Sequence, residues 1–236
     1  MIKDRIQKLR KLFKEFNIDG YIIPKNDEFF SEFSREDHLK IISNFSGSAG
    51  YAVVLKNKNY LFVDGRYTIQ AQIESGNNFI IKKYNDIIDC GFFKKLVIGY
   101  NPKLFTSNQI KMFFSKKNKV KIISNDLIGK FYKKKDKNLK PFFSLKKDIV
   151  GQGFKSKIDK VSNYLKAKNF DFLFISAPEN VAWLLNIRGN DNPNSPLPNC
   201  HLFLDNKKNF YLFADRKKTQ ALIKEKKINQ NQIFDF

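Results

Sequence analysis

The chain has 236 residues, of which 42% are hydrophobic and 15% aromatic, and its formal net charge is +21. A chain of this length can bury roughly 70–75% of its unfolded surface, so a sizeable core is expected. No apolar run approaches the ~20 residues of a membrane span, and the charged start MIKDRIQKLRKLF differs from a signal peptide. We therefore expect a cytoplasmic protein with no membrane partner, in which Cys90 and Cys200 are packing residues in a reducing compartment.

The large positive charge does not by itself indicate a nucleic-acid partner. Six of the 44 basic residues are Arg, whereas recognition of bases and phosphates depends largely on the bidentate guanidinium group. The chain is also rich in Ile, Asn, Phe and Lys together, which is typical of AT-rich coding and places Lys on every surface. We expect a solvated basic surface and no nucleic-acid partner. A basic nucleic-acid-binding module is the weaker alternative.

An amphipathic helix is predicted over residues 2–16, where apolar residues recur at three- and four-residue steps. Gly20 offers the positive φ that a helix exit often needs, and Pro24 stops the short strand that follows. The elements after this helix are predicted in the order strand 21–23, helix 34–44, strands 51–55 and 60–63 as a hairpin, helix 67–74, strands 79–84 and 96–100, helix 106–114 and strand 120–123.

Residues 129–153 are basic and contain the helix breakers Pro141 and Gly151, which predicts a connection between two domains. The elements after this connection are predicted as helix 155–168, strand 170–176, helix 179–185, a long loop over 189–198, strands 200–204 and 210–213 as a second hairpin, and helix 216–226. Helices alternate with strands, yet the central strands come as hairpins. An α/β fold with a mixed sheet flanked by helices is therefore predicted, built twice.

The same unit is repeated along the chain. Residues 5–24 align with residues 157–176, and at nearly the same offset YLFVD of residues 60–64 aligns with YLFAD of residues 211–215. The alternative explanation is that helix-then-strand units resemble one another without a true repeat. Two matches at nearly one offset favour the repeat.

The repeat predicts the domain organisation. We predict an N-terminal domain over residues 1–128, a linker over 129–153 and a second domain over 154–236. The second copy is expected to be truncated, because it stops before the counterparts of the elements predicted in residues 96–123. The chain is therefore expected to be a fragment of a longer protein.

Motifs for catalysis are sparse. The two histidines, His38 and His201, lie in different copies, and the sequence contains no His-Glu-x-x-His or Cys-x-x-Cys motif. SGSAG of residues 46–50 matches neither a Gly-x-Ser-x-Gly nucleophile elbow nor a phosphate loop ending in Gly-Lys-Ser/Thr. We predict no catalytic residue and no metal ligand in this chain, and a surface or core position for both histidines.

Arg66 is the main candidate for ligand binding. It lies in DGRY of residues 64–67, where a predicted strand turns into a helix, a position at which α/β sheets commonly contact ligands. Its guanidinium can pair with a carboxylate, such as a peptide terminus, through two parallel hydrogen bonds. A salt bridge to Asp64 or a contact with a neighbouring domain is the structural alternative. The second copy has DRK at residues 215–217, without the glycine.

Three motifs together carry a family resemblance: FSGSAG at 45–50, VDGRY at 63–67 and NVAWLLNIRGND at 180–191. They resemble the N-terminal and middle domains of aminopeptidase P, the Xaa-Pro aminopeptidase of the creatinase/prolidase family, and the resemblance covers nearly the whole chain. It implies two related creatinase N-terminal-type (ribonuclease H-like) α/β domains ahead of a pita-bread catalytic domain. That third domain holds two metal ions, usually manganese, through two Asp, one His and two Glu, and none of these ligands can be placed here.

The resemblance also implies roles for particular residues. Arg66 is implied to contact the peptide substrate, while Trp183, Arg188 and Asp191 are expected to line a cleft toward the catalytic domain, with core packing as the alternative for Trp183. The parent enzyme removes the N-terminal residue that precedes proline, and its N-terminal domains form a homodimer and restrict access to Xaa-Pro peptides. We expect this chain alone to be inactive and to hold no cofactor, the two Mn²⁺ ions belonging to the missing domain. A free-standing interaction module is the alternative.

Overall fold

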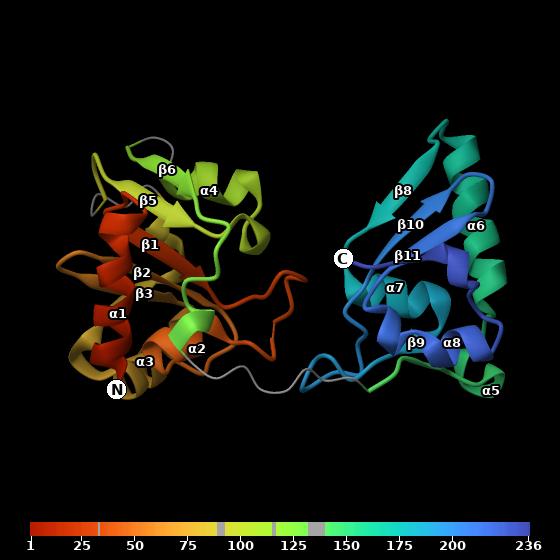
Figure 1. Ribbon diagram of the computed structural model, residues 1–236, viewed down its shortest axis with the longest axis horizontal. Helices are drawn as coiled ribbons and strands as arrows, with labels where there is room; N and C mark the ends of the chain where they lie inside the picture. Colours follow the sequence, from red (N-terminus) through yellow and green to blue (C-terminus); the bar gives the residue numbers. More distant parts are fainter. Residues whose placement is uncertain (33, 89–92, 115–116, 132–139) are drawn as a thin grey trace. The chain divides into compact units, whose positions relative to one another are not determined.

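The computed structural model describes residues 1–32, 34–88, 93–114, 117–131 and 140–236 (Figure 1). The chain divides into two compact units, Met1–Lys135 and Asp136–Phe236, which are named the first unit and the second unit. Cys90 lies outside the described residues. Among these residues, no helix combines the length and the apolar character that a membrane crossing requires.

The first unit is built on a mixed sheet. Its strands are β1 (Gly20–Pro24), β2 (Gly50–Leu55), β3 (Asn59–Val63), β4 (Ile80–Lys83), β5 (Val97–Tyr100) and β6 (Lys119–Ile122). Its helices are α1 (Ile2–Glu15), α2 (His38–Ser43), α3 (Thr68–Ser75) and α4 (Ser107–Phe114), with 3-10 turns η1 (Gly65–Tyr67), η2 (Gly76–Asn78), η3 (Tyr84–Ile87), η4 (Pro102–Leu104) and η5 (Gly129–Phe131). The six strands follow the order β4-β3-β2-β1-β5-β6, in which β2 is antiparallel to both neighbours and the other pairs are parallel.

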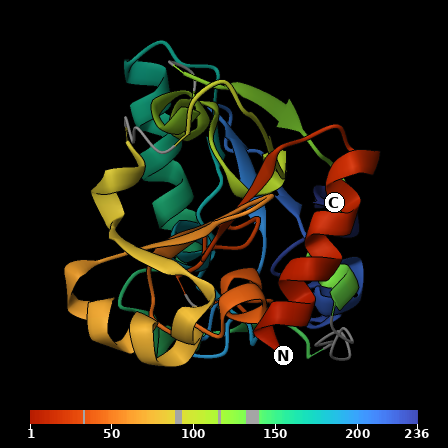
Figure 2. The same ribbon diagram turned by 90° about the vertical axis from the view of Figure 1, so that its left-hand side faces the viewer.

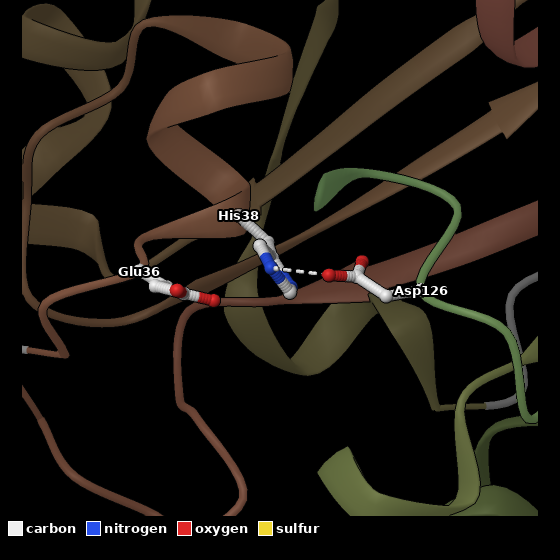
Figure 3. Close-up of side chains that lie close together, drawn as sticks. All are labelled: Glu36, His38 and Asp126. Atoms are coloured by element: carbon white, nitrogen blue, oxygen red, sulfur yellow. Dashed lines mark ion pairs between the residues drawn. The ribbon is translucent and has the colours of Figure 1, made fainter. Parts of the chain in front are cut away.

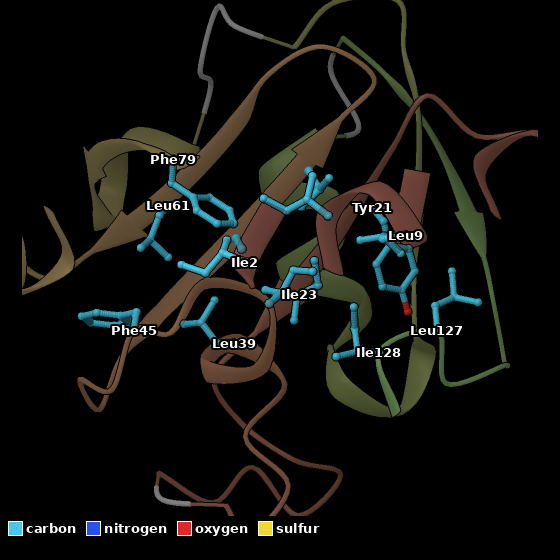
Figure 4. Close-up of a cluster of buried hydrophobic side chains, with 14 of the residues drawn as sticks. Ile2, Leu9, Tyr21, Ile23, Leu39, Phe45, Leu61, Phe79, Leu127 and Ile128 are labelled. Atoms are coloured by element: carbon cyan, nitrogen blue, oxygen red, sulfur yellow. The ribbon is translucent and has the colours of Figure 1, made fainter. Parts of the chain in front are cut away.

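Both faces of this sheet are covered. Helix α1 buries one stripe at helical spacing, and it lies beside α2 in both views (Figures 1 and 2). Figure 4 shows Leu9 of α1, Leu39 of α2 and Ile23 of β1 within this core. Strand residues alternate between faces, so Ile22 and Phe62 belong to a second core on the opposite face, together with side chains of α4. The central strands β1, β2 and β3 are therefore buried on both sides, whereas the edge strands β4 and β6 are more exposed.

The second unit repeats part of this plan. Its strands are β7 (Phe143–Ser144), β8 (Phe172–Ile175), β9 (Ile187–Arg188), β10 (His201–Asp205), β11 (Phe210–Phe213) and β12 (Ile233–Phe234). Its helices are α5 (Lys147–Val150), α6 (Phe154–Ala167), α7 (Pro178–Leu185) and α8 (Gln220–Lys224), with 3-10 turns η6 (Arg216–Lys218) and η7 (Gln230–Gln232). The order β12-β11-β10-β8 has the same strand directions as β4-β3-β2-β1, and β7 pairs with β9. Side chains of α6, α7 and α8 form one core with this sheet.

The exit from the first helix differs from the prediction. Asn17, with φ 48°, takes the left-handed conformation, and its repeat counterpart Asn169 does the same with φ 56°. The prediction that Gly20 serves this purpose is wrong. Gly20 lies inside β1, where a Cβ would come within 2.5 Å of the Leu55 side chain and 3.0 Å of Val54 O, so close packing favours glycine there.

The predicted helix over 216–226 is also wrong in its first half, where the chain forms η6 and then α8. The Asp215 carboxylate accepts a hydrogen bond from Lys217 N at 2.9 Å, and Thr219 Oγ1 donates to Arg216 O at 2.8 Å. Such local bonds compete with helical hydrogen bonding. They shorten the helix to the residues after Thr219.

Two further boundaries differ from the sequence prediction. The helix expected over 34–44 begins only at His38, because Asp37 acts as its N-cap and accepts from Lys40 N at 2.9 Å. The segment expected to be a linker contains β7 and α5, which belong to the second unit. β7 exists through its pairing with β9, a partner distant in sequence that local patterns do not reveal.

Candidate functional site

Arg66 lies where β3 ends and the chain turns into α3. The Asp64 carboxylate organises this turn, because its Oδ1 accepts from Arg66 N at 3.0 Å and from Arg66 Nε at 2.9 Å. The Arg66 side chain is nevertheless 77% exposed. The motif thus presents a guanidinium at the surface, on a rigid 3-10 turn.

The loop of residues 45–50 supports this turn from the side. Tyr67 shares a hydrogen bond of 3.1 Å with Ser48 Oγ and packs edge-on against Phe45, with ring centroids 5.8 Å apart. A Cβ at Gly47 would come within 2.3 Å of the Phe45 ring, so only glycine fits. The FSGSAG and DGRY motifs therefore pack against each other and form one local structure.

A hydrogen-bond network ties the same loop to α3. Ser46 N donates to Glu74 Oε2 at 2.7 Å, Ser46 Oγ donates to Glu74 Oε1 at 2.6 Å, and Gln70 Nε2 donates to Ser46 Oγ at 2.9 Å. Burial acts to raise the pKa of Glu74, but the hydrogen bonds from Ser46 and Gln70 outweigh it and lower that pKa. The network therefore favours the ionised carboxylate.

The ion pair between Asp64 and Arg66 is open to solvent. The hydrogen bond from Arg66 lowers the pKa of Asp64, and the same bond raises the pKa of Arg66. Exposed pairs of this kind contribute little to stability, because water and salt screen them. The guanidinium can consequently exchange Asp64 for the carboxylate of a ligand at small cost.

The second copy uses its arginine differently. Arg216 Nη2 donates to Ile233 O at 3.1 Å, and its backbone N donates to Asp235 Oδ1 at 3.0 Å. These bonds fasten β12 to the end of β11. Arg216 is therefore a structural residue, whereas Arg66 has only its own turn as a partner among these contacts.

Trp183 lies on α7 beside an apolar pocket of about 360 Å³, whose lining residues also include Leu173, Phe174 and Asn180. Its side chain is 59% exposed. Lys157 Nζ lies 4.1 Å from the centre of the indole ring and donates to Trp183 O at 2.7 Å. Burial lowers the pKa of Lys157. The cation–π contact holds the ring on the pocket wall.

Arg188 and Asp191 lie apart from this pocket lining. Arg188 Nη1 donates to Ala182 O at 3.2 Å, which satisfies a carbonyl near the end of α7. Asp191 is 5% exposed, pairs with Lys218 and accepts from Asn199 N at 2.8 Å. Arg188 thus stabilises the end of α7, and Asp191 stabilises the loop after β9. Of the three expected cleft residues, Trp183 alone is among the residues that line this pocket.

Three titratable side chains meet at one place in the first unit. The donor atoms of Glu36, His38 and Asp126 all lie within 4.8 Å of one another, the only such group of three or more in the part of the chain that the structure describes. Figure 3 shows them converging from the start of α2 and from the segment after β6. The sequence did not connect them, because Asp126 is remote and no spacing motif links it to His38. Three donors do not fit the five-ligand di-metal centre of the resembled family, so we assign them no catalytic step.

Two family models match the chain, both described as the creatinase/prolidase N-terminal domain, over residues 5–121 and 133–234. The chain belongs to this family and carries its domain twice. The predicted family and the predicted α/β fold class are thereby confirmed.

Particular relatives agree with this assignment. The chain is 33% identical over 218 residues to a probable Xaa-Pro aminopeptidase P of Pyrenophora teres f. teres, covering 82% of this chain and 32% of that protein. It is 30% identical over 244 residues to Aminopeptidase P2 of Arabidopsis thaliana, covering 88% and 33%. The chain therefore resembles the N-terminal part of these enzymes and spans about a third of their length.

A solved structure matches the whole chain. The crystal structure of an X-prolyl aminopeptidase from Caenorhabditis elegans, described as a cytosolic enzyme with a di-nuclear active site, aligns with a TM-score of 0.85 and 25% identity. The alignment covers 100% of this chain and 42% of that one. The fold of both units is thus that of a known aminopeptidase.

Proposed function

We propose that this chain is the N-terminal, non-catalytic portion of a metal-dependent Xaa-Pro aminopeptidase. The observation that carries the proposal is the joint match of both units, in order, to aminopeptidase P relatives of which the chain spans a third. In this proposal the longer protein is cytoplasmic and removes the N-terminal residue that precedes proline. Its metal site, two manganese ions, belongs to a further domain.

The role proposed for these two units is homodimerisation and control of substrate access. The second unit offers exposed apolar side chains for such contacts, among them Phe172 at 61%, Phe174 at 55% and Trp183 at 59% exposure. Apolar clusters of this kind typically mark interaction surfaces. They support a role in contacts with a partner domain or subunit.

Arg66 is proposed to bind a carboxylate of the peptide substrate. Its support is geometric: the guanidinium is exposed, stands on a turn braced by Tyr67, and has the solvent-exposed Asp64 as its ion-pair partner among the described residues. Arg66 donates to both Asp64 oxygens, from Nε at 2.9 Å and from Nη2 at 3.5 Å, so the second of these bonds is long. A ligand carboxylate that makes two short parallel bonds to the guanidinium would replace this pair.

The first test of the proposal is an activity assay on residues 1–236. Purified chain is incubated with Xaa-Pro peptides, with and without Mn²⁺, and release of the first residue is measured. We expect no release in either case. Metal-dependent release of the first residue would show that the chain carries its own catalytic site and would overturn the proposal.

The second test is the reading frame beyond the codon for Phe236. We expect a continuation that encodes two Asp, one His and two Glu. The support is that this chain spans about a third of the length of these relatives. An immediate stop codon would contradict the proposal and favour a free-standing interaction module.

A further inference from the structure

The side chain of His38 is buried in an unusual way. The residue is 8% exposed, and its Nε2 atom is buried without a hydrogen-bond partner. Asp126 Oδ2 lies 3.6 Å from this nitrogen, which is beyond hydrogen-bond length (Figure 3). A buried nitrogen without a hydrogen-bond partner costs free energy. A ligand that binds His38 Nε2 would remove this cost.

The carboxylate of Asp126 is fixed in position from the other side. Its Oδ1 accepts from Ile128 N at 3.1 Å and from Gly129 N at 2.8 Å. These bonds occupy one oxygen and leave Oδ2 on the side of His38. A Cβ at Gly129 would lie 2.0 Å from Oδ2, so the absence of a side chain there makes room for the carboxylate.

The cluster of Glu36, His38 and Asp126 contains two carboxylates. Asp37, between Glu36 and His38, is the N-cap of α2 and pairs with the buried Lys25. Among the described residues, no Lys or Arg forms an ion pair with Glu36 or Asp126. Within the described ranges, the carboxylates of Glu36 and Asp126 thus lie near the His38 imidazole without a Lys or Arg ion pair of their own.

We propose that Glu36, His38 and Asp126 bind one divalent transition-metal ion of the zinc class. One imidazole nitrogen and two carboxylate oxygens form a donor set that Zn²⁺ takes at about 2.0–2.2 Å, which puts ligand atoms roughly 3–4 Å apart. The separation of 3.6 Å between His38 Nε2 and Asp126 Oδ2 matches this range. Mg²⁺ and Ca²⁺ prefer oxygen ligands alone, so the imidazole selects against them.

The ion links two segments that are far apart in the sequence. Asp126 is followed by Leu127 and Ile128, which enter the first core (Figure 4), whereas His38 begins α2 on the same core. Binding to the folded form alone stabilises that form. The ion therefore acts as a clip that holds the last segment of the first unit against α2.

The test uses the chain of 236 residues, produced without a histidine tag and freed of metal with a chelator. Zn²⁺ is titrated by calorimetry, and Co²⁺ is added separately so that its visible absorption reports the ligands. We expect one equivalent to bind at micromolar or tighter affinity, and the unfolding temperature to rise by about 5 °C at a 100-fold excess over Kd. Mg²⁺ is expected to bind at least about 100-fold more weakly.

Variants separate this site from adventitious binding. Asp126→Asn keeps an oxygen for the turn but removes the charge, and His38→Ala removes the nitrogen, so each is expected to weaken binding at least about tenfold. Gly129→Ala displaces the carboxylate without deleting it and is expected to weaken binding as well. His201→Ala, which changes the other histidine, is the control and should leave the titration unchanged.

Three outcomes would overturn the proposal: no binding of Zn²⁺ or Co²⁺ below about 100 μM, binding that survives both His38→Ala and Asp126→Asn, or binding that is lost in His201→Ala. Circular dichroism of each variant establishes that it is folded. Asp126→Asn is nearly isosteric, so it keeps the test valid if His38→Ala fails to fold.

Discussion

The two units share a strand order but differ in what covers the sheet. In the first unit, Leu61 and Phe62 point to opposite faces, and both are fully buried. In the second unit, the equivalent Leu212 is fully buried, whereas Phe213 is only partly buried. The alternation of side chains is the same in both copies. The difference lies in the second layer over the sheet, which in the first unit includes side chains of residues 84–87 and 93–114.

Aromatic side chains fill the less covered face of the second sheet. Phe172 contacts Phe203 with ring centroids 5.0 Å apart, Tyr211 contacts Phe234 at 5.9 Å, and Phe213 contacts Phe234 at 5.5 Å. A sheet with apolar residues on both faces is typical of a strand layer meant to be buried between two layers. The sequence of the second copy is thus that of a sheet with a layer packed on each face. This agrees with the prediction that the second copy lacks the counterparts of residues 96–123.

The largest expected effect is a difference in the free energy of unfolding between Phe62→Ala and Phe213→Ala. Phe62→Ala is expected to lower the free energy of unfolding by about 3–5 kcal/mol, because it opens a cavity in a closed core. Phe213→Ala is expected to cost about 1 kcal/mol or less. Urea unfolding is followed by circular dichroism and by fluorescence of Trp183, the single tryptophan, which reports on the second unit.

Leu61→Ala and Leu212→Ala provide the matched control. Both residues are fully buried against helices, so each is expected to cost about 2–5 kcal/mol in its own unit. Equal costs for Phe62→Ala and Phe213→Ala would show that the second sheet is as well covered as the first and would remove the contrast.

The next largest effect is a difference between Arg66→Ala, which is expected to change KM, and Arg216→Ala, which is expected to change stability. In the longer enzyme, Arg66→Ala is expected to raise KM for Xaa-Pro peptides about tenfold with little change in kcat, because a bidentate carboxylate bond is lost. Arg216→Ala is expected to leave KM unchanged and to lower the free energy of unfolding by about 0.5–1 kcal/mol through its lost bonds to β12. An unchanged KM in Arg66→Ala would contradict the proposed substrate contact.

A smaller effect concerns the exposed aromatic face. The pair Phe172→Ser and Phe174→Ser is expected to reduce the binding of a hydrophobic dye to this chain by about half, without loss of secondary structure. The equivalent change in the first unit, Ile22→Ser, is expected to increase dye binding instead, because it disrupts a buried core. Dye fluorescence and circular dichroism are measured on the same samples.

The smallest effect is a pH dependence confined to the first unit. A carboxyl group whose pKa is lowered by folding stabilises the protein above its ordinary pKa of 4.5, and this stabilisation is lost as the pH falls through the lowered value. Glu74→Gln is therefore expected to destabilise the first unit near pH 7 and to have little effect once the pH is well below the ordinary pKa of 4.5. Thermal unfolding over this pH range tests it, with Glu225→Gln at the equivalent position as the control.

Local patterns predicted much of this molecule. Helical periodicity located α1 and α6 within one residue at each end, and the YLFVD and YLFAD strings located the second strand of both hairpins. These features depend on neighbours in sequence. The two-residue strands β7, β9 and β12 were not predicted, because such short strands exist only through partners elsewhere in the chain.

The candidate sites likewise differ in whether they depend on residues that are adjacent or distant in the sequence. The turn around Arg66 was predicted, since its residues are adjacent and its geometry is local. The surroundings of Asp191 were not, because its ion pair with Lys218 joins residues from different loops. The cluster at His38 required Asp126, which only the folded chain brings near.

Strand β8 stands at the edge of its sheet, with β10 as its partner among the described residues. Its sequence FLFI contains no charge, proline or glycine, the devices by which edge strands usually avoid pairing with other chains. The backbone groups on its outer side can therefore template the addition of a strand from another molecule. Produced by itself at high concentration, this chain should form β-rich aggregates that begin at β8, and a single Leu173→Lys substitution on that edge should suppress them.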